Sequence, residues 1–254
     1  MAALDGQHAV VTGGGRGIGA AIAGALAAAG AKLTLMGRNQ AQLQDQAAML
    51  ATAHAIRCDV TEEADVGAAF AQARKTFGQI AILINNAGAA ESAPFARTSL
   101  ELFRRMLEVN LVGTFLCSRA VLPDMLEAGF GRIVNVASIA GLKGAAYVSA
   151  YCAAKHGVVG LTRSLALETA TRGITVNAVC PSYTDTDMVR SAIANIVEKS
   201  GRSAAQAEGE LVGKNPQGRL IRPEEVAATV LWLCAPGAEA ITGQAIAVAG
   251  GEVM

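Results

Sequence analysis

Two side chains near the middle of the chain have types and a spacing that suit proton transfer. Tyr151 and Lys155 lie four residues apart in a segment with a helical pattern, so both project from one helix face. An ammonium beside a phenol favours the phenolate and lowers a tyrosine pKa that is normally about 10. The pair therefore predicts a tyrosine that can donate a proton to a developing alkoxide.

A hydroxyl group can join this pair. Ser138 comes just after a predicted strand, 132–136, and thirteen residues before Tyr151. The carboxyl ends of parallel strands open onto the crevice in which α/β proteins bind ligands. We therefore expect Ser138 to hydrogen-bond a substrate oxygen while Tyr151 gives or takes the proton.

A glycine-rich turn supplies a second kind of chemistry. The run Gly13-Gly14-Gly15-Arg16-Gly17-Ile18-Gly19 follows a predicted strand and opens a predicted helix. Glycine lets the backbone approach a diphosphate closely, and a helix N-terminus offers free N–H groups to it. This context predicts a dinucleotide site, with a purely structural strand-to-helix turn as the alternative.

The residue after the second predicted strand bears on which dinucleotide binds. An acidic residue there would bind the ribose hydroxyls of NAD, but this chain has Gly37-Arg38. An arginine can pair with a 2′-phosphate, and Arg16 in the glycine turn can add a second positive charge. The sequence favours NADP(H), with NAD(H) possible if Arg38 is only a solvated surface residue.

The elements that must position these residues alternate along the chain. Short apolar runs are separated by longer segments of helical period, and strands without a polar face indicate a parallel sheet covered on both sides. We predict an α/β, doubly wound Rossmann fold with about seven strands. The predicted strands are 8–12, 32–36, 53–58, 80–84, 132–136, 174–179 and 245–248. The predicted helices are 17–29, 61–77, 99–128 (with irregularities at Gly113 and Pro123), 150–171 and 223–234.

No linker, repeat or low-complexity tract divides the sequence, so we expect one domain over 1–254. A more polar segment, 187–218, interrupts the alternation after a predicted strand. An insertion at a strand's carboxyl end falls on the ligand side of such a sheet. We expect a substrate lid there, and a peripheral helix pair is the alternative.

Composition excludes several classes of function. The 254 residues carry 21 Lys and Arg against 21 Asp and Glu, so the neutral chain has no general attraction for nucleic acid or anionic membranes. The five cysteines are scattered and the three histidines do not cluster, which predicts no metal site. No secretory signal or membrane-spanning run is evident, so we expect a cytoplasmic protein.

These motifs together resemble the short-chain dehydrogenase/reductase family along the whole chain. The resemblance implies catalytic roles for four residues: Asn110, Ser138, Tyr151 and Lys155. It also implies cofactor contacts by Tyr151, Lys155 and the following: Thr12, Gly13, Gly15, Arg16, Gly17, Ile18, Gly19, Arg38, Asp59, Val60, Asn86, Ala87, Gly88, Pro181, Thr184 and Thr186. Ser182 stands where the family usually has glycine. In this scheme Lys155 binds the nicotinamide ribose and tunes Tyr151, and Asn110 holds a water behind Lys155.

The resemblance also bears on substrate and assembly. The segments 215–219 and 223–227 resemble those of β-ketoacyl reductases and 3-hydroxyacyl-CoA dehydrogenases. They imply a 3-oxoacyl or 3-hydroxyacyl thioester or a similar hydrophobic substrate. Carrier-protein reductases of this family have basic residues at two positions that dock an acidic carrier protein. Arg172 fits one of these positions, but Gly129 occupies the other. One alternative is a dehydrogenase of free hydroxy acids, sugars or steroids. The other is a non-catalytic NAD(P)-binding regulator. Apolar residues on several faces of 99–128 and 150–171 predict a homotetramer.

Overall fold

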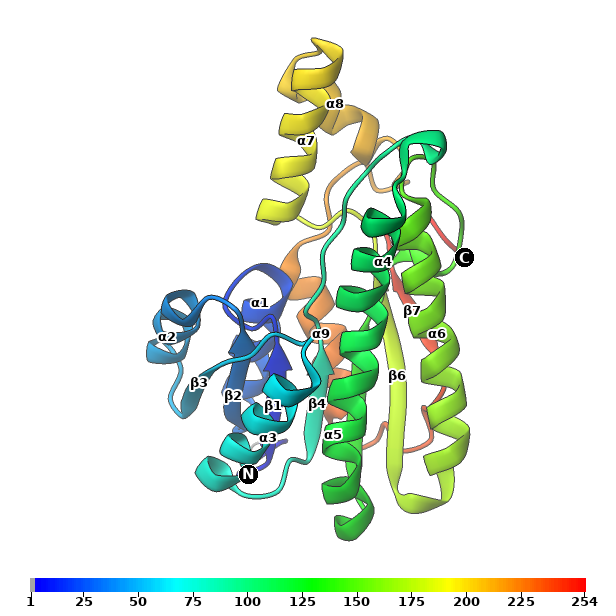
Figure 1. Cartoon of the computed structure of the whole chain (residues 1–254). Helices are drawn as coiled ribbons and strands as arrows, with labels where there is room; N and C mark the ends of the chain where they lie inside the picture. The colour runs from blue at the N-terminus through cyan, green and yellow to red at the C-terminus, as the bar shows by residue number, and fades with distance from the viewer. Residues whose placement is uncertain (1–2) are drawn as a thin grey trace.

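A parallel sheet forms the centre of the molecule. The computed structural model describes residues 3–254, and within them seven strands pair in the order β3-β2-β1-β4-β5-β6-β7 (Figure 1). The strands are β1 His8–Thr12, β2 Lys32–Gly37, β3 Ala53–Arg57, β4 Ile82–Asn85, β5 Gly131–Val136, β6 Ile174–Pro181 and β7 Ala245–Val248. The predicted doubly wound α/β fold is confirmed, because the chain reverses direction across the sheet between β1 and β4.

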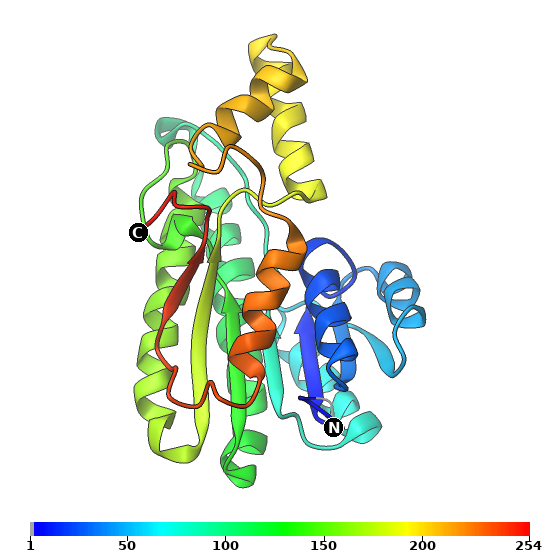
Figure 2. The same ribbon diagram turned by 180° about the vertical axis from the view of Figure 1, so that it is seen from behind.

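Helices cover both faces of the sheet, as Figures 1 and 2 show from opposite sides. They are α1 Gly17–Ala28, α2 Gln40–Ala48, α3 Glu63–Phe77, α4 Leu100–Leu107, α5 Gly113–Ala128, α6 Ser149–Thr169, α7 Asp187–Ser200, α8 Ala204–Val212 and α9 Pro223–Cys234. Alternate residues of β1 face opposite layers. Val11 packs with residues of α1 and α9, and Val10 packs with residues of α3 and α5. Apolar side chains on both faces are what a strand covered from two sides requires.

The long predicted helix 99–128 is three elements. It consists of α4, a π-helical turn over Glu108–Val112, and α5. The irregularity falls at Asn110, whereas Gly113 begins α5 and Pro123 lies inside it. The Asn110 side-chain amide donates to the Met106 carbonyl oxygen at 2.9 Å, so this side chain competes for an acceptor of the helix backbone.

The run Leu100–Ala128 is long and apolar enough to cross a membrane by length and composition alone. In the fold it lies beside β4 and β5 (Figure 1), and buried residues of α5 such as Val121 and Met125 belong to the core. Packing against the sheet therefore accounts for its apolar character.

Other boundaries differ by one or two residues. Thr61 does not open a helix, because its N–H and hydroxyl donate to Asp59 Oδ1 at 3.1 and 2.8 Å and form a turn. The helix α3 begins at Glu63 instead. Asn39 caps α2, with its Oδ1 accepting from the Gln42 N–H at 3.2 Å.

The helices α7 and α8 project beyond the carboxyl ends of the strands (Figures 1 and 2). Gly201, with φ of 68°, ends α7, and a capping box between Ser203 and Gln206 begins α8. The base of this pair is closed where Thr184 pairs with Ile221 in a short parallel bridge. Residues 187–218 therefore leave and re-enter the fold at neighbouring points.

Candidate active site

The predicted catalytic and cofactor residues meet at one edge of the sheet. The glycine turn follows β1, Asn86 to Gly88 follow β4, and Ser138 follows β5. Because all the strands are parallel, their carboxyl ends lie at the same edge. The fold thus brings Gly13, Asn86 and Ser138 to one edge although they are far apart in the sequence.

The glycine turn leaves no room for side chains where the chain bends. A Cβ on Gly19 would lie 2.2 Å from the Gly13 carbonyl oxygen, and one on Gly13 would lie 2.8 Å from Asn86 Nδ2. Gly13 and Gly17 have positive φ values of 65° and 54°. The turn leads directly into α1, so the first N–H groups of this helix face the concave backbone. This backbone fits the close approach of a diphosphate.

Side chains tie the glycine turn to the fourth strand. The Thr12 hydroxyl accepts hydrogen bonds from the N–H groups of Asn86 and Ala87, both at 3.0 Å. Asn86 Nδ2 donates in return to the carbonyl oxygens of Thr12 and Gly13, at 3.0 and 3.2 Å. The two walls of the predicted cofactor crevice are thereby fixed relative to each other.

Two arginines lie beside this crevice. Arg38 follows β2 and is exposed, and within residues 3–254 no carboxylate lies within ion-pair distance of it. Arg16 lies in the glycine turn, with Nη1 3.8 Å from Asp187 Oδ2 at the start of α7. Gly17 lies on the same side, because its Cβ would come within 3.2 Å of Thr186 Cγ2. Arg38 is therefore free to bind an anion, whereas Arg16 already lies beside Asp187 of α7.

The residues after β3 form a separate wall. Asp59 holds the turn that includes Thr61, and its own N–H donates to Asp65 Oδ2 at 3.3 Å. Val60 is buried against α5, where a Cβ on Gly113 would meet Val60 Cγ2 at 2.7 Å. These contacts fix the backbone of 59–60 at the side of the crevice where an adenine is expected.

The proton-transfer residues occupy the start of α6 and the end of β5. Lys155 is buried, its Nζ donates to the Val136 carbonyl oxygen at 2.8 Å, and Nζ lies 5.6 Å from the centre of the Tyr151 ring. Ser138 has extended backbone, and its Oγ accepts from the Ala140 N–H at 3.1 Å. The carbonyl that anchors Lys155 is therefore two residues from the proposed substrate-binding hydroxyl.

The electrostatics differ from the expectation for Tyr151. Burial raises the pKa of Tyr151 to about 12, and the Ser138 hydroxyl within reach of the phenol offsets only part of this. Burial also lowers the pKa of Lys155 to about 8. The expected lowering of the tyrosine pKa is therefore not found: desolvation dominates, and the phenol keeps its proton at neutral pH.

Asn110 connects the π turn to the fourth-strand loop. Its Nδ2 donates to the Ala89 and Met106 carbonyl oxygens, both at 2.9 Å, and its Oδ1 accepts from the Ala89 N–H at 3.3 Å. A Cβ on Gly88 would lie 2.8 Å from Asn110 Oδ1 and 3.7 Å from Lys155 Nζ. Gly88 therefore lies between the two side chains, and any larger residue would separate them.

The segment after β6 completes the crevice. Pro181 ends β6, and the hydroxyls of Thr184 and Thr186 donate to the carbonyl oxygens of Ser182 and Thr184 at 2.9 and 3.1 Å. Ser182 does not adopt a left-handed conformation, so serine in place of glycine is not strained here. Its hydroxyl instead donates to the Glu252 carboxylate.

Sequence reasoning missed one strained residue near the site. Tyr147 has a φ of 67° and is the only non-glycine residue with positive φ within the described part of the chain. Its carbonyl oxygen accepts from the Ala93 N–H at 2.7 Å, which joins the loop before α6 to the loop after β4. Such backbone strain concentrates at functional sites. No local signal marks it, because a tyrosine is not expected in that conformation.

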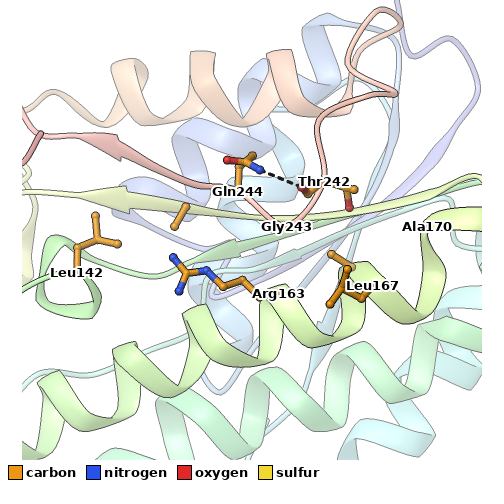
Figure 3. Close-up of a pocket in the computed structure, with 9 residues that line it drawn as sticks. Leu142, Arg163, Leu167, Ala170, Thr242, Gly243 and Gln244 are labelled. Carbon is orange, nitrogen blue, oxygen red and sulfur yellow. Dashed lines mark hydrogen bonds between the residues drawn. The ribbon is translucent and has the colours of Figure 1, made fainter.

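A surface groove lies elsewhere, between α6 and the loop before β7 (Figure 3). Its lining includes Leu142, Arg163, Leu167, Thr242 and Gln244. The Leu167 side chain is largely exposed there. None of the catalytic side chains lines this groove, so it is separate from the site at the strand ends.

Comparison with known proteins shows the family to which the chain belongs. Residues 7–196 match the family model described as short chain dehydrogenase. The chain is 40% identical over 253 residues to 2-(S)-hydroxypropyl-CoM dehydrogenase 3 of Xanthobacter autotrophicus, covering 98% of this chain and 97% of that protein. It is 37% identical over 256 residues to D-beta-hydroxybutyrate dehydrogenase of Cupriavidus necator, covering 98% and 99%.

Solved structures give the same result. A variant of actinorhodin polyketide ketoreductase with NADPH superposes with a TM-score of 0.95 at 38% identity and covers 99% of both chains. Levodione reductase superposes with a TM-score of 0.94 at 34% identity and covers 98% of both chains. The chain belongs to the short-chain dehydrogenase family, and it is an oxidoreductase that acts on CH–OH groups.

Proposed function

We propose that the protein interconverts a hydrophobic ketone and its secondary alcohol with NADP(H). One observation carries this: the buried Lys155, the proton-bearing Tyr151 and Ser138 lie beside a glycine turn that fits a diphosphate. Hydride transfer to the carbon of a C=O bond requires a proton donor beside the oxygen of that bond, and this arrangement supplies one.

The cofactor residues follow from the crevice. The backbone of Gly13, Gly15, Gly17 and Ile18 and the start of α1 would hold the diphosphate, with Gly19 keeping the turn tight. Asp59, Val60 and the loop 86–88 would border the adenosine half. Thr184, Thr186 and Pro181 would border the nicotinamide half. The unpaired Arg38, aided by Arg16, favours NADP(H) over NAD(H) through the 2′-phosphate.

The proton steps are assigned to the chain's own residues. The cofactor supplies or accepts the hydride when bound. Ser138 donates a hydrogen bond to the substrate oxygen and holds it against the phenol of Tyr151. Tyr151 then transfers its proton to that oxygen as negative charge develops on it. Lys155 places a positive charge beside the phenol and so stabilises the phenolate that remains.

Asn110 has a positioning role in this scheme. Both of its amide hydrogens and its oxygen are engaged with Ala89 and Met106. It therefore holds the loop that includes Gly88 against Lys155, and we propose that this places the proton path behind the lysine. A water on that path would lie near the Asn110 oxygen.

The substrate class rests on the walls of the cleft and on the relatives. The loop after β4, the loop before α6 and the segment 187–218 carry apolar residues such as Phe95, Val148 and Met188. The relatives include a 2-(S)-hydroxypropyl-CoM dehydrogenase and a D-beta-hydroxybutyrate dehydrogenase, and a structural neighbour is a polyketide ketoreductase. We propose a 3-oxoacyl or 3-hydroxyacyl thioester or a similarly hydrophobic compound, with 187–218 as a lid over it.

We also propose a cytoplasmic homotetramer in which 1–254 form a single domain. Phe115 on α5, Leu167 on α6 and Trp232 on α9 are exposed, which supports interfaces on these helices. Much of the apolar surface expected on α5 and α6 is internal, since Val121 and Val158 are buried. Light scattering should give about four times the chain mass of 25.8 kDa, and a mass near 25.8 kDa would refute the assembly.

The catalytic proposal is tested by following NADPH absorbance with a panel of ketones, starting with acetoacetyl-CoA and ending with small cyclic ketones. Ketone-dependent oxidation of NADPH that is lost in Tyr151→Phe supports the proposal. Tight NADPH binding without turnover on any ketone or alcohol would instead favour a non-catalytic cofactor-binding protein.

A further inference from the structure

A buried carboxylate lies outside the machinery described so far. The Glu252 side chain, on the segment after β7, is only 3% exposed. Its Oε1 accepts from Lys143 Nζ at 3.1 Å, and its Oε2 accepts from the Ser182 hydroxyl. A buried carboxylate is costly unless it is paired and hydrogen-bonded, and here both oxygens have partners. Those partners are 109 and 70 residues away in the sequence.

A tight turn brings this carboxylate back to the strand ends. The Glu252 N–H donates to the Ala249 carbonyl oxygen at 3.0 Å, across Gly250 and Gly251 with φ values of 58° and 92°. A Cβ on Gly250 would lie 2.1 Å from Asn215 Oδ1. The turn thus rests on the segment that leaves α8, and only glycine can make it there.

Each contact of this turn belongs to a different wall of the proposed cleft. Lys143 lies on the loop between Ser138 and Tyr151. Ser182 lies between Pro181 and Thr184, and its N–H donates to the Val248 carbonyl oxygen at 3.1 Å. Asn215 lies at the exit of the 187–218 segment, where it binds the Arg219 carbonyl oxygen and the Gln217 N–H, both at 2.9 Å. The turn after β7 is the point at which these three walls meet.

We propose that Glu252 is a positioning residue for substrate binding, which holds the Lys143 loop and the Ser182 segment at a fixed separation across the cleft. The proposal rests on the proposed ketone reductase function and deepens it. It also gives a role to Ser182, because a glycine at that position could not donate to the carboxylate. A residue with this role affects how well a substrate fits, and the proton donor and the glycine turn stay intact.

The first arm of the test measures kinetics with the purified full chain. Glu252→Gln keeps the size of the side chain but presents an NH₂ group to one of two donors. We expect a roughly tenfold rise in KM for the ketone, the scale of one hydrogen bond to a charged group, with a smaller change in kcat. The Kd for NADPH should rise by less than the KM for the ketone, because the glycine turn is untouched and only the 182–186 segment, at the nicotinamide half, is loosened. Glu127→Gln, an exposed carboxylate at the opposite edge of the sheet, is the matched control.

Further variants separate positioning from simple anchoring. Lys143→Arg keeps the ion pair and should keep the wild-type KM, whereas Lys143→Met should raise KM. Ser182→Ala removes the other donor, and its effect should add little to that of Glu252→Gln in the double variant, because both act through one contact. A lower melting temperature with unchanged KM would show a merely structural anchor and overturn the proposal. If Glu252→Gln does not fold, Ser182→Ala and Lys143→Met carry the same test.

The second arm needs no substrate. Hydrogen–deuterium exchange of Glu252→Gln should be faster than that of wild type in peptides over 139–148, 182–186 and 213–219, and unchanged in α3. Unchanged exchange in the first three peptides would overturn the proposal even if the wild type reduces no ketone in the panel. A wild type that reduces no ketone would by itself refute only the proposed reaction. Failure of the positioning proposal and failure of the proposed reaction are therefore distinguishable.

Discussion

The strand ends and the α7–α8 pair above them are held by different kinds of interaction. At the strand ends Lys155, Asn110 and Thr12 are buried and bonded to backbone groups of other elements. In the α7–α8 pair, Arg190 pairs with Asp185 and Asp187, and Arg202 pairs with Glu210, all largely exposed. Exposed ion pairs stabilise a fold by only about 0–1 kcal/mol each.

The two kinds of interaction suit two different roles: proton transfer at the strand ends and substrate selection by the α7–α8 pair. Proton transfer depends on small distances, so its residues belong on elements that the core holds in place. A segment that closes over substrates must open again, and weakly held surface elements suit that need. We therefore expect substitutions at the strand ends to change turnover strongly, and substitutions in α7 and α8 to change affinity mildly.

The largest effect should come from the proton donor. Tyr151→Phe removes the hydroxyl and should lower kcat by at least ~10²-fold, the usual scale of general acid catalysis. NADPH affinity should change little, because most cofactor contacts come from the glycine turn. Stopped-flow turnover and fluorescence titration of NADPH measure the two quantities. Turnover near that of wild type in the pure variant would remove Tyr151 from the mechanism.

Much of the fold around the strand ends could be predicted from the sequence. The strands β1 and β7 and the helix α9 begin and end at the predicted residues, because apolar runs there are bounded by glycine, proline or polar residues. The glycine turn and Ser138 take the predicted places because each follows a strand, and parallel strands end together.

Other features depend on contacts that no local pattern encodes. At the π turn the Asn110 amide donates to the Met106 carbonyl oxygen, a contact between side chain and backbone that the helical pattern of the sequence does not show. The pKa of Tyr151 rises because desolvation in the fold outweighs the hydrogen bond from Ser138, and the spacing of Tyr151 and Lys155 in the sequence does not reveal that balance. Glu252 finds both partners through the turn after β7, at distances along the chain that sequence spacing cannot reveal.

The next effect concerns the anion site at the same edge. Arg38→Asp replaces a free cation with a repulsive charge beside the expected 2′-phosphate. We expect the ratio of kcat/KM for NADPH to that for NADH to fall by about 10- to 100-fold, the scale of one or two charge-assisted hydrogen bonds. Arg57→Asp on the next strand is a useful control, since Arg57 already pairs with Asp65. A wild type that prefers NADH would contradict the assignment of Arg38.

A pH effect should follow from the buried lysine. Burial lowers the pKa of Lys155 to about 8, so its charge is present below that pH and is lost as pH rises through it. The pKa of Tyr151, at about 12, leaves the phenol protonated over the same range. The kcat/KM for reduction should therefore be level below about pH 8 and fall about tenfold per pH unit above it. In Lys155→Arg the guanidinium stays charged, so any remaining activity should lack this decline; a decline that persists would assign it to another group.

The smallest effect should appear where the two regions meet. Arg16 belongs to the glycine turn, yet its guanidinium lies 3.8 Å from the Asp187 carboxylate at the start of α7. That carboxylate competes with a 2′-phosphate for the same cation. Asp187→Asn should therefore tighten NADPH binding by about two- to fourfold, the scale of an exposed ion pair, and leave NADH binding unchanged. Asp185→Asn is the matched control, because Asp185 pairs with Arg190. Isothermal titration with both cofactors measures the difference. Equal tightening for NADPH and NADH would place the effect on closure of α7 rather than on the phosphate, and the weakly held region would then influence cofactor binding as well as substrate selection.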